Sequence, residues 1–137
     1  MEFVALDFET DEAGRPWQLG AARFLDGKLA ETRDWRFADG NVLEKWEEIY
    51  GLLRDRTLVA HNLACEKTIL TRLAPLTRLG PWTDTLKIAR KRYPGLKSYE
   101  LGALCAAFGC VPEMAGRTWH DGLYDAVACG MLYEKIA

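Results

Sequence analysis

Acidic side chains recur in three separate segments of the sequence, and two of these segments also carry a histidine. The residues of these segments that could do chemistry are Asp7, Glu9, His61, Asn62, Glu66, His120 and Asp125. Gathered in one place, carboxylates supply the hard oxygen ligands that Mg²⁺ and Mn²⁺ prefer. A nearby imidazole, with an ordinary pKa near ~6.5, can accept a proton from water at neutral pH. Together these groups would support metal-dependent hydrolysis, provided that the fold brings them together.

Asp7 and Glu9 lie two residues apart in the apolar segment 3–9, which the sequence predicts as a β-strand. Because alternate side chains of a strand point to the same face, both carboxylates are expected on one face. A cation or a proton would offset their mutual repulsion and lost hydration. Two exposed carboxylates at the end of a strand would explain the same pattern without any chemistry.

His61 and Asn62 directly follow an apolar strand expected at 57–60, and Glu66 falls in the first turns of the next helix. Open α/β sheets bind ligands at the carboxyl ends of their strands, which favours a functional role for these residues. A structural interpretation stays open as well. In it, Asn62 turns the chain and Glu66 complements the positive end of the helix.

His120 precedes, and Asp125 begins, a helix expected over 122–136. The short connection between them can bring both side chains to one site. A histidine beside Trp119 is often a structural group, whereas Asp125 lies among apolar neighbours, where an unpaired carboxylate is costly.

Hydrophobic periodicity and turn residues predict the strands and helices that carry these residues. We expect strands at 3–9, 17–24, 29–37, 57–60 and 82–85, and helices at 42–53 (capped by Asn41), 66–73, 98–108 (capped by Ser98) and 122–136. This order predicts an α/β domain with a mixed five-stranded sheet, flanked by helices on both faces. An antiparallel three-strand meander and two parallel strands would form the sheet.

Length and composition narrow the class of protein. With 137 residues, of which 49% are hydrophobic, the chain fits one domain, residues 1–137, and not a disordered polymer. A net charge of −2 argues against a histone-like binder, although residues 67–97 hold eight Lys and Arg against the single acid Asp84.

The N-terminus lacks the features of a signal peptide and no apolar run is long enough to span a membrane, which predicts a cytoplasmic protein. The cysteines are expected to be reduced, with Cys105 and Cys129 packed as small hydrophobic residues.

The order and spacing of the motifs resemble the DEDDh 3′–5′ exonuclease family. The closer resemblance is to its DnaQ-like, proofreading-subunit-like branch, which has a ribonuclease-H-like fold. The motifs that carry the resemblance are Asp7-x-Glu9, His61-Asn62 with Glu66, and His120-x4-Asp125. Segments 83–86 and 92–101 also resemble the region between the second and third motifs of that family, so the match covers nearly the whole chain.

The resemblance implies an enzyme that releases nucleoside 5′-monophosphates from the 3′ end of single-stranded or frayed DNA or RNA, alone or beside a polymerase or another protein. It implies that two Mg²⁺ or Mn²⁺ ions are held by Asp7 (bridging), Glu9, Asp125 and, through water, Glu66. His120 would be the general base for the attacking water. The implied substrate-binding residues are Thr10, His61 and Asn62.

Departures from the family pattern keep other interpretations open. Glu66 stands where the family has aspartate, Asp11 and Glu12 add negative charge after the first motif, and segment 37–61 is shorter than in relatives. Glu66 and the shortened segment favour a nuclease-fold module that binds nucleic acid or a polymerase-type protein partner with little catalysis. A third interpretation is a metal-dependent phosphohydrolase of small nucleotides, because a fold alone does not determine the substrate.

Overall fold

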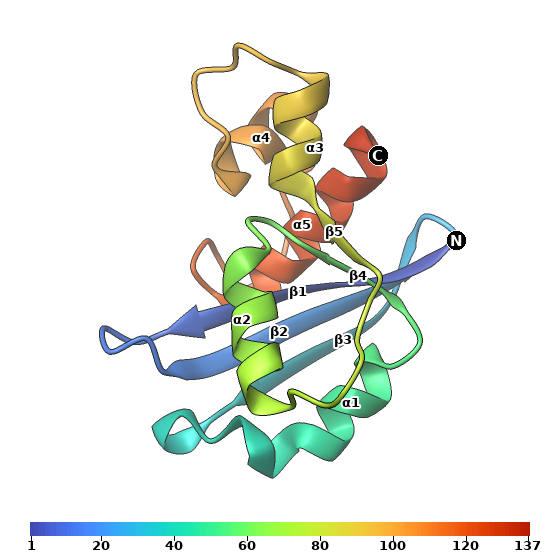
Figure 1. Ribbon diagram of the computed structural model, residues 1–137. Helices are drawn as coiled ribbons and strands as arrows, with labels where there is room; N and C mark the ends of the chain where they lie inside the picture. The colour runs from blue at the N-terminus through green and yellow to red at the C-terminus, as the bar shows by residue number, and fades with distance from the viewer.

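The computed structural model describes residues 1–137 and contains one five-stranded mixed sheet with β1 at its centre (Figure 1). Along the sheet the strands lie in the order β3-β2-β1-β4-β5. They are β1 (Glu2–Thr10), β2 (Pro16–Leu25), β3 (Lys28–Arg36), β4 (Thr57–Ala60) and β5 (Trp82–Asp84). The first three strands pair antiparallel, whereas β4 pairs parallel with β1, and β5 parallel with β4. The predicted α/β class and the predicted sheet are therefore confirmed.

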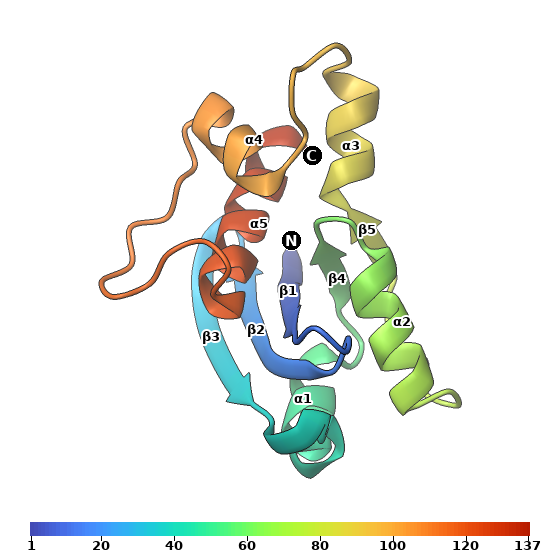
Figure 2. The same cartoon turned by 90° about the vertical axis from the view of Figure 1, so that its left-hand side faces the viewer.

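Five helices surround this sheet. They are α1 (Trp46–Leu53), α2 (Ala64–Leu73), α3 (Thr85–Arg92), α4 (Leu101–Phe108) and α5 (Gly122–Ile136). Helices α1 and α2 pack on one face of the sheet and α5 packs on the other. Helices α3 and α4 lie together at one end of the molecule, where they pack against α5 (Figures 1 and 2). No helix is both long enough and apolar enough to cross a membrane.

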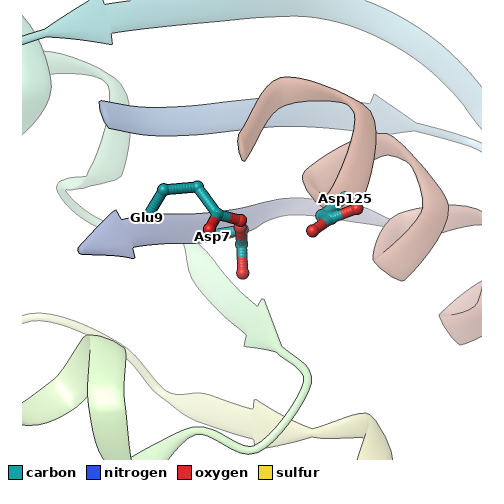
Figure 3. Close-up of side chains that lie close together, drawn as sticks. All are labelled: Asp7, Glu9 and Asp125. Carbon is teal, nitrogen blue, oxygen red and sulfur yellow. The ribbon is translucent and has the colours of Figure 1, made fainter. Parts of the chain in front are cut away.

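The alternation of side chains along β1 determines where its acids point. Val4 and Leu6 are buried with α1 and α2 on one face, and Phe3 and Ala5 are buried with α5 on the other. Asp7 continues the odd-numbered series, as does Glu9 two residues later, so both carboxylates face α5 (Figure 3). The prediction that they share a face is confirmed.

Helix α3 is absent from the sequence-based prediction, which places residue 85 at the end of a strand and has no helix or strand over residues 86–92. The amphipathic pattern that reveals most helices is weak here, because only Thr85 and Ala89 are buried while the last turn is basic. The sequence analysis predicts Asp84 only as part of a strand. In the structure it also caps α3, because its carboxylate accepts a hydrogen bond from the backbone N–H of Leu86 at 2.9 Å.

Asn41 and Ser98 were predicted to cap helices, and both predictions are wrong. Neither side chain accepts a hydrogen bond from a backbone N–H in the first turn of a helix. Asn41 makes no side-chain capping bond, and residues 42–45 form a 3₁₀ turn before α1 begins at Trp46. Ser98 Oγ accepts a hydrogen bond from the backbone N–H of Glu100 at 3.2 Å, so it closes a local turn just before α4. Cys105 and Cys129 are buried and free, as predicted.

Candidate active site

Three carboxylates from two distant parts of the chain meet beside the centre of the sheet. Asp7 and Glu9 extend from β1 and Asp125 from the first turn of α5 (Figure 3). One oxygen from each lies within 4.8 Å of the corresponding oxygens of the other two. The geometry therefore gathers three of the acids that the sequence analysis singled out, and we refer to them as the carboxylate cluster.

Two oxygens of the carboxylate cluster are buried without any hydrogen-bond donor. They are Oδ2 of Asp7 and Oδ1 of Asp125. Buried polar atoms are almost always satisfied in folded proteins, so each orphan needs a partner from outside the chain. A divalent cation fits, because it prefers several carboxylate oxygens and removes the repulsion among them.

Burial and the neighbouring negative charges favour the protonated forms of Asp7 and Asp125 when no cation is bound. Burial is the main cause that raises the pKa of Asp7, to about 10, and the neighbouring Glu9, Glu66 and Asp125 add to it. Burial also raises the pKa of Asp125 to about 7, with a further contribution from Glu9, while His120 acts in the opposite direction. A bound cation would reverse these shifts by favouring the charged forms.

The strand edge next to the cluster is open because β4 is short. β4 pairs with β1 only along Phe3–Ala5, so beyond Ala5 the backbone of β1 is paired with β2 on one side and has no strand on the other. Glu66 of α2 fills this position, and its Oε2 accepts a hydrogen bond from the backbone N–H of Phe8 at 3.2 Å. Glu66 is 3% exposed, and burial raises its pKa to about 7. Its carboxylate is near Asp7 but is not a member of the three-carboxylate group.

Gln18 on β2 is fully buried, and its side chain determines where α5 begins. Its Oε1 accepts a hydrogen bond from the backbone N–H of Gly122 at 2.8 Å. Its Nε2 donates to Asp34 at 3.1 Å and to Asp121, the residue that caps α5, at 3.3 Å. Arg117 donates to the same two acids, each at 2.9 Å. This network joins the start of α5, and hence Asp125, to the sheet.

The close approach of α5 to the sheet depends on Gly20 of β2. A Cβ atom at this position would overlap the backbone carbonyl group of Gly122 and the backbone nitrogen of Leu123. Because those are backbone atoms, no side-chain movement could relieve the overlap. The absence of a side chain at position 20 therefore lets the first turn of α5 reach the carboxylate cluster.

His120 lies at the mouth of the site, immediately before the residue that caps α5. It is exposed, and its φ of 71° is in the left-handed region, which residues other than glycine adopt mainly in turns and functional sites. It lines a cleft of about 580 Å³ together with Asp125 and Trp119. His61, Leu101 and Gly102 also line the cleft. An exposed imidazole and an acid of the carboxylate cluster thus share one cleft.

His61, predicted to bind substrate, has both ring nitrogens engaged within the protein. Nε2 donates to the backbone oxygen of Tyr99 at 2.7 Å, so Nδ1 is the acceptor for the Thr85 hydroxyl, also at 2.7 Å. Burial lowers the pKa of His61, which favours this neutral form. The ring therefore contributes a surface to the cleft wall and ties the segment before α4 to the sheet.

The two other predicted substrate-binding residues lie at the edges of the site. Thr10 is exposed at the end of β1, after an irregularity in the pairing of β1 with β2. Asn62 has a φ of 63°, its backbone N–H donates to Asp84 at 2.9 Å, and its side chain is exposed. The structure thus leaves the side chains of Thr10 and Asn62 accessible from solvent.

The negative charge that follows the first motif is partly compensated. Oδ1 of Asp11 accepts backbone N–H groups of Ala13 and Arg15, each at 2.9 Å, and its Oδ2 pairs with the Arg15 guanidinium at 3.0 Å. The Arg15 backbone and side chain keep the pKa of Asp11 below its usual value. Asp11 therefore organises the turn between β1 and β2.

Sequence reasoning missed Gln18, Arg117 and Gly20 as residues that position the site. Gln18 is the one polar residue in the segment Trp17–Phe24 apart from Arg23, and this isolated amide in an apolar strand was the available signal. Nothing in the sequence near Gly20 indicates its partner, because Gly122 lies more than 100 residues further along the chain.

Comparisons with known proteins agree with this architecture. Exonuclease X, solved in complex with 5′-overhanging duplex DNA, matches with a TM-score of 0.76 at 20% sequence identity, covering 98% of this chain and 90% of that chain. This likeness establishes the ribonuclease-H-like fold.

The chain is similar in sequence to short parts of two PolC-type DNA polymerases III. No protein-family model matches the chain. It is 28% identical, over 166 aligned positions, to the PolC-type DNA polymerase III of Halalkalibacterium halodurans, covering 98% of this chain and 11% of that protein. It is 31% identical over 99 residues to the PolC-type DNA polymerase III of Bacillus cereus, covering 69% of this chain and 6% of that protein. The chain thus spans about a tenth or less of the length of these relatives. Fold and sequence similarity together support a place in the DnaQ-like family of 3′–5′ exonucleases.

Proposed function

We propose that residues 1–137 form one exonuclease domain that hydrolyses the last phosphodiester bond of a single-stranded or frayed 3′ end. The products would be nucleoside 5′-monophosphates and a strand shortened by one nucleotide. The observation that carries this proposal is the carboxylate cluster, whose two orphaned buried oxygens lie beside a cleft lined by His120. The similarity to PolC-type polymerases and to exonuclease X supports it.

Each residue of the site has a distinct part in this chemistry. Asp7, Glu9 and Asp125 would hold two divalent cations, Mg²⁺ or Mn²⁺, with Glu66 acting on the second ion through water. When bound, such ions neutralise charge on the phosphate and lower the pKa of water. The imidazole of His120 would accept the proton of the attacking water at a ring nitrogen and release it to solvent, because the ring is exposed.

The cleft wall would hold the terminal nucleotide in position for attack. Trp119 lines the cleft, and the edge contact between its ring and that of Tyr124, with centroids 4.8 Å apart, fixes its orientation. Stacking of a base on such a fixed aromatic ring tolerates any sequence. Thr10, at the exposed end of β1, would contact the same nucleotide from the other side of the carboxylate cluster.

A second candidate function is a binding module with weak catalysis, and Glu66 is the observation that favours it. Glu66 satisfies the backbone of β1 through its hydrogen bond to Phe8, and its raised pKa keeps part of it protonated at neutral pH. A carboxyl group that is hydrogen-bonded to the backbone and partly protonated would attract a second metal ion less strongly. Similarity to PolC-type polymerases makes a polymerase a reasonable partner for either function.

One assay separates these functions. An oligonucleotide labelled at its 5′ end, and another labelled at its 3′ end, are incubated with the protein and Mg²⁺, Mn²⁺ or chelator. If the protein is a 3′–5′ exonuclease, we expect a metal-dependent ladder of shortened products from the 5′-labelled strand. The 3′-labelled strand should release a labelled mononucleotide. Asp125→Asn should abolish both. Asp55→Asn is the matched control, since it removes the same charge at an exposed turn with a φ of 56° that asparagine tolerates well.

The other outcomes each identify an alternative. Binding of the strand without cleavage under all conditions would support the module. Cleavage of nucleotides but not of strands would support a phosphohydrolase. A ladder that persists in Asp125→Asn would show that the carboxylate cluster is not the site of hydrolysis.

A further inference from the structure

A second cavity, of about 300 Å³, adjoins the active-site cleft and carries positive charge. Arg90, Lys97, Ser98 and Asn62 line it, and it shares His61 and Glu100 with the cleft that holds His120 and Asp125. The two cavities are therefore neighbours along one surface. We refer to the second one as the basic pocket.

The cations of the basic pocket are not neutralised within the protein. Neither Arg90 nor Lys97 forms an ion pair with any carboxylate of the chain. The Arg90 guanidinium lies over the ring of Tyr99, with 5.7 Å between its central carbon and the ring centroid. This contact orients the guanidinium without using its hydrogen-bond donors, because it is made through the face of the ring.

Tyr99 is itself held rigidly, so Arg90 rests on a fixed surface. The Tyr99 hydroxyl donates to the backbone oxygen of Tyr93 at 2.7 Å and accepts the backbone N–H of Leu96 at 3.2 Å. The backbone oxygen of Tyr99 accepts the hydrogen bond from His61. The residue that orients Arg90 is thus joined directly to the wall of the active-site cleft.

Further donors and one acid complete the basic pocket. Ser98 Oγ accepts the backbone N–H of Glu100, which leaves the serine hydroxyl hydrogen free to donate. The exposed side chain of Asn62 has no hydrogen bond to another residue, so its amide is also free to donate. Glu100 is the single acid in the lining, against the two cations. The balance of charge and the surplus of donors suit an anion with several oxygens.

The remaining cations of segment 67–97 have other surroundings. Arg92 donates to the backbone oxygen of Ile136 at 2.9 Å and so connects α3 to α5. Lys67, Arg72 and Arg78 line separate cavities beside α2. The positive charge noted in the sequence is therefore divided between surfaces, and the basic pocket is the part that adjoins the cleft.

We propose that the basic pocket binds a backbone phosphate of the substrate strand, next to the phosphate that is cleaved. Arg90 would make the main contact, with Lys97, Ser98 and Asn62 as further donors. This inference rests on the proposed exonuclease function and adds the path by which the strand leaves the cleft. Such contacts hold the strand in register whatever its sequence, which suits an enzyme that removes one nucleotide after another.

The test compares two double variants that remove equal charge. Arg90→Ala with Lys97→Ala alters the basic pocket, whereas Lys87→Ala with Lys91→Ala removes two exposed cations of α3 that do not line it. The pocket variant should raise KM for a single-stranded oligonucleotide by roughly tenfold or more, since hydrogen bonds to charged groups are lost. Its kcat at saturating strand should stay within about twofold of wild type, because phosphate contacts position the strand and do not react. The control variant should change neither quantity.

A binding measurement without catalysis keeps this test separate from the proposed function. Fluorescence anisotropy of a labelled oligonucleotide, in chelator and over a range of salt, gives the dependence of log Kd on log salt. Loss of the contact to this one phosphate should reduce the slope by about 0.7, the value for one phosphate of a single strand. Equal KM values and equal slopes for the two double variants, in a wild-type background that cleaves the strand, would overturn the inference. Absence of both cleavage and binding in the wild-type protein would instead overturn the proposed function.

Discussion

The backbone N–H of Phe8 donates a hydrogen bond to Oε2 of Glu66 at 3.2 Å, between the two acids of the first motif. An acid on α2 thereby occupies the place that a neighbouring strand would have if β4 were longer. The side chain of glutamate spans this gap and satisfies a strand N–H that is otherwise without a partner. Position 66 therefore combines a structural hydrogen bond with a negative charge near Asp7.

Substitution Glu66→Gln separates these two contributions. The amide oxygen of glutamine can still accept the hydrogen bond from Phe8, so the fold should be retained while the charge is removed. We expect the single-turnover rate, at saturating Mg²⁺ or Mn²⁺, to fall by roughly tenfold or more, as for loss of an electrostatic group in a site. Glu48→Gln, on the exposed face of α1, should leave the rate unchanged. If Glu66→Gln reacts as fast as wild type, Glu66 has no part in the chemistry.

Substitution Gln18→Leu tests the network that positions α5. Leucine has a similar size but leaves the N–H of Gly122 without an acceptor and removes a donor from Asp34 and Asp121. The expected loss in free energy of unfolding is about 2 kcal/mol, the usual cost of a buried group left unpaired. Denaturant unfolding measures this loss, and the rate constant at saturating strand should fall with it because Asp125 is displaced. Unchanged values of both would mean that α5 is held by other contacts.

Substitution Gly20→Ala tests the close approach of α5 to the sheet. The new methyl group would overlap the backbone of Gly122, so α5 must move outward. We expect destabilisation by about 1–3 kcal/mol, as for other overpacked cores, and weaker binding of Mn²⁺. Gly51→Ala is the matched control. It lies in α1 with no atoms near its Cβ position, so it should be neutral or stabilising by up to about 1 kcal/mol. Equal Mn²⁺ affinity in both variants would contradict this account of Gly20.

The raised pKa values predict how pH and metal together affect stability. Asp125 and Glu66 have pKa values of about 7 in the folded chain, above the ordinary values of 3.8 and 4.5. The stability that their protonated forms contribute is fully present below about pH 4 and is lost as pH rises through about 7. Metal binds the ionised forms, so saturating Mg²⁺ or Mn²⁺ should raise the Tm strongly at pH 8 and little at pH 5. Asp125→Asn should reduce the increase at pH 8. A metal-induced increase in Tm that is equal at pH 5 and pH 8 would contradict the prediction.

Local sequence patterns predicted the placement of those site residues that depends only on the geometry of one strand or one helix start. The alternation of side chains in a strand placed Asp7 and Glu9 on one face, and the residues ahead of α5 indicated that His120 and Asp125 share a site. The family resemblance supplied the expectation that these two segments meet. Helix α3 was missed because its stabilising contacts come from α4 and α5, and not from a clear apolar stripe of its own.

The residues that position the site could not be predicted, because their contacts join distant parts of the chain. Gln18 and Gly122 are 104 residues apart, and Phe8 and Glu66 are 58 apart. A single polar residue in an apolar strand indicates that some partner exists but does not identify it. In the same way, the charge of segment 67–97 gave no sign that Arg90 and Lys97 line the basic pocket while Arg92 supports the helix packing.

Metal binding by the carboxylate cluster can be observed in a crystal structure of the protein soaked with Mn²⁺, with anomalous scattering used to locate the metal. We expect anomalous density in contact with oxygens of Asp7, Glu9 and Asp125, at coordination distances of about 2.1 Å. The same experiment on Asp125→Asn should show this density weakened or lost. Well-ordered carboxylates with no anomalous density among them, at a Mn²⁺ concentration that supports cleavage, would show that the carboxylate cluster does not hold the metal.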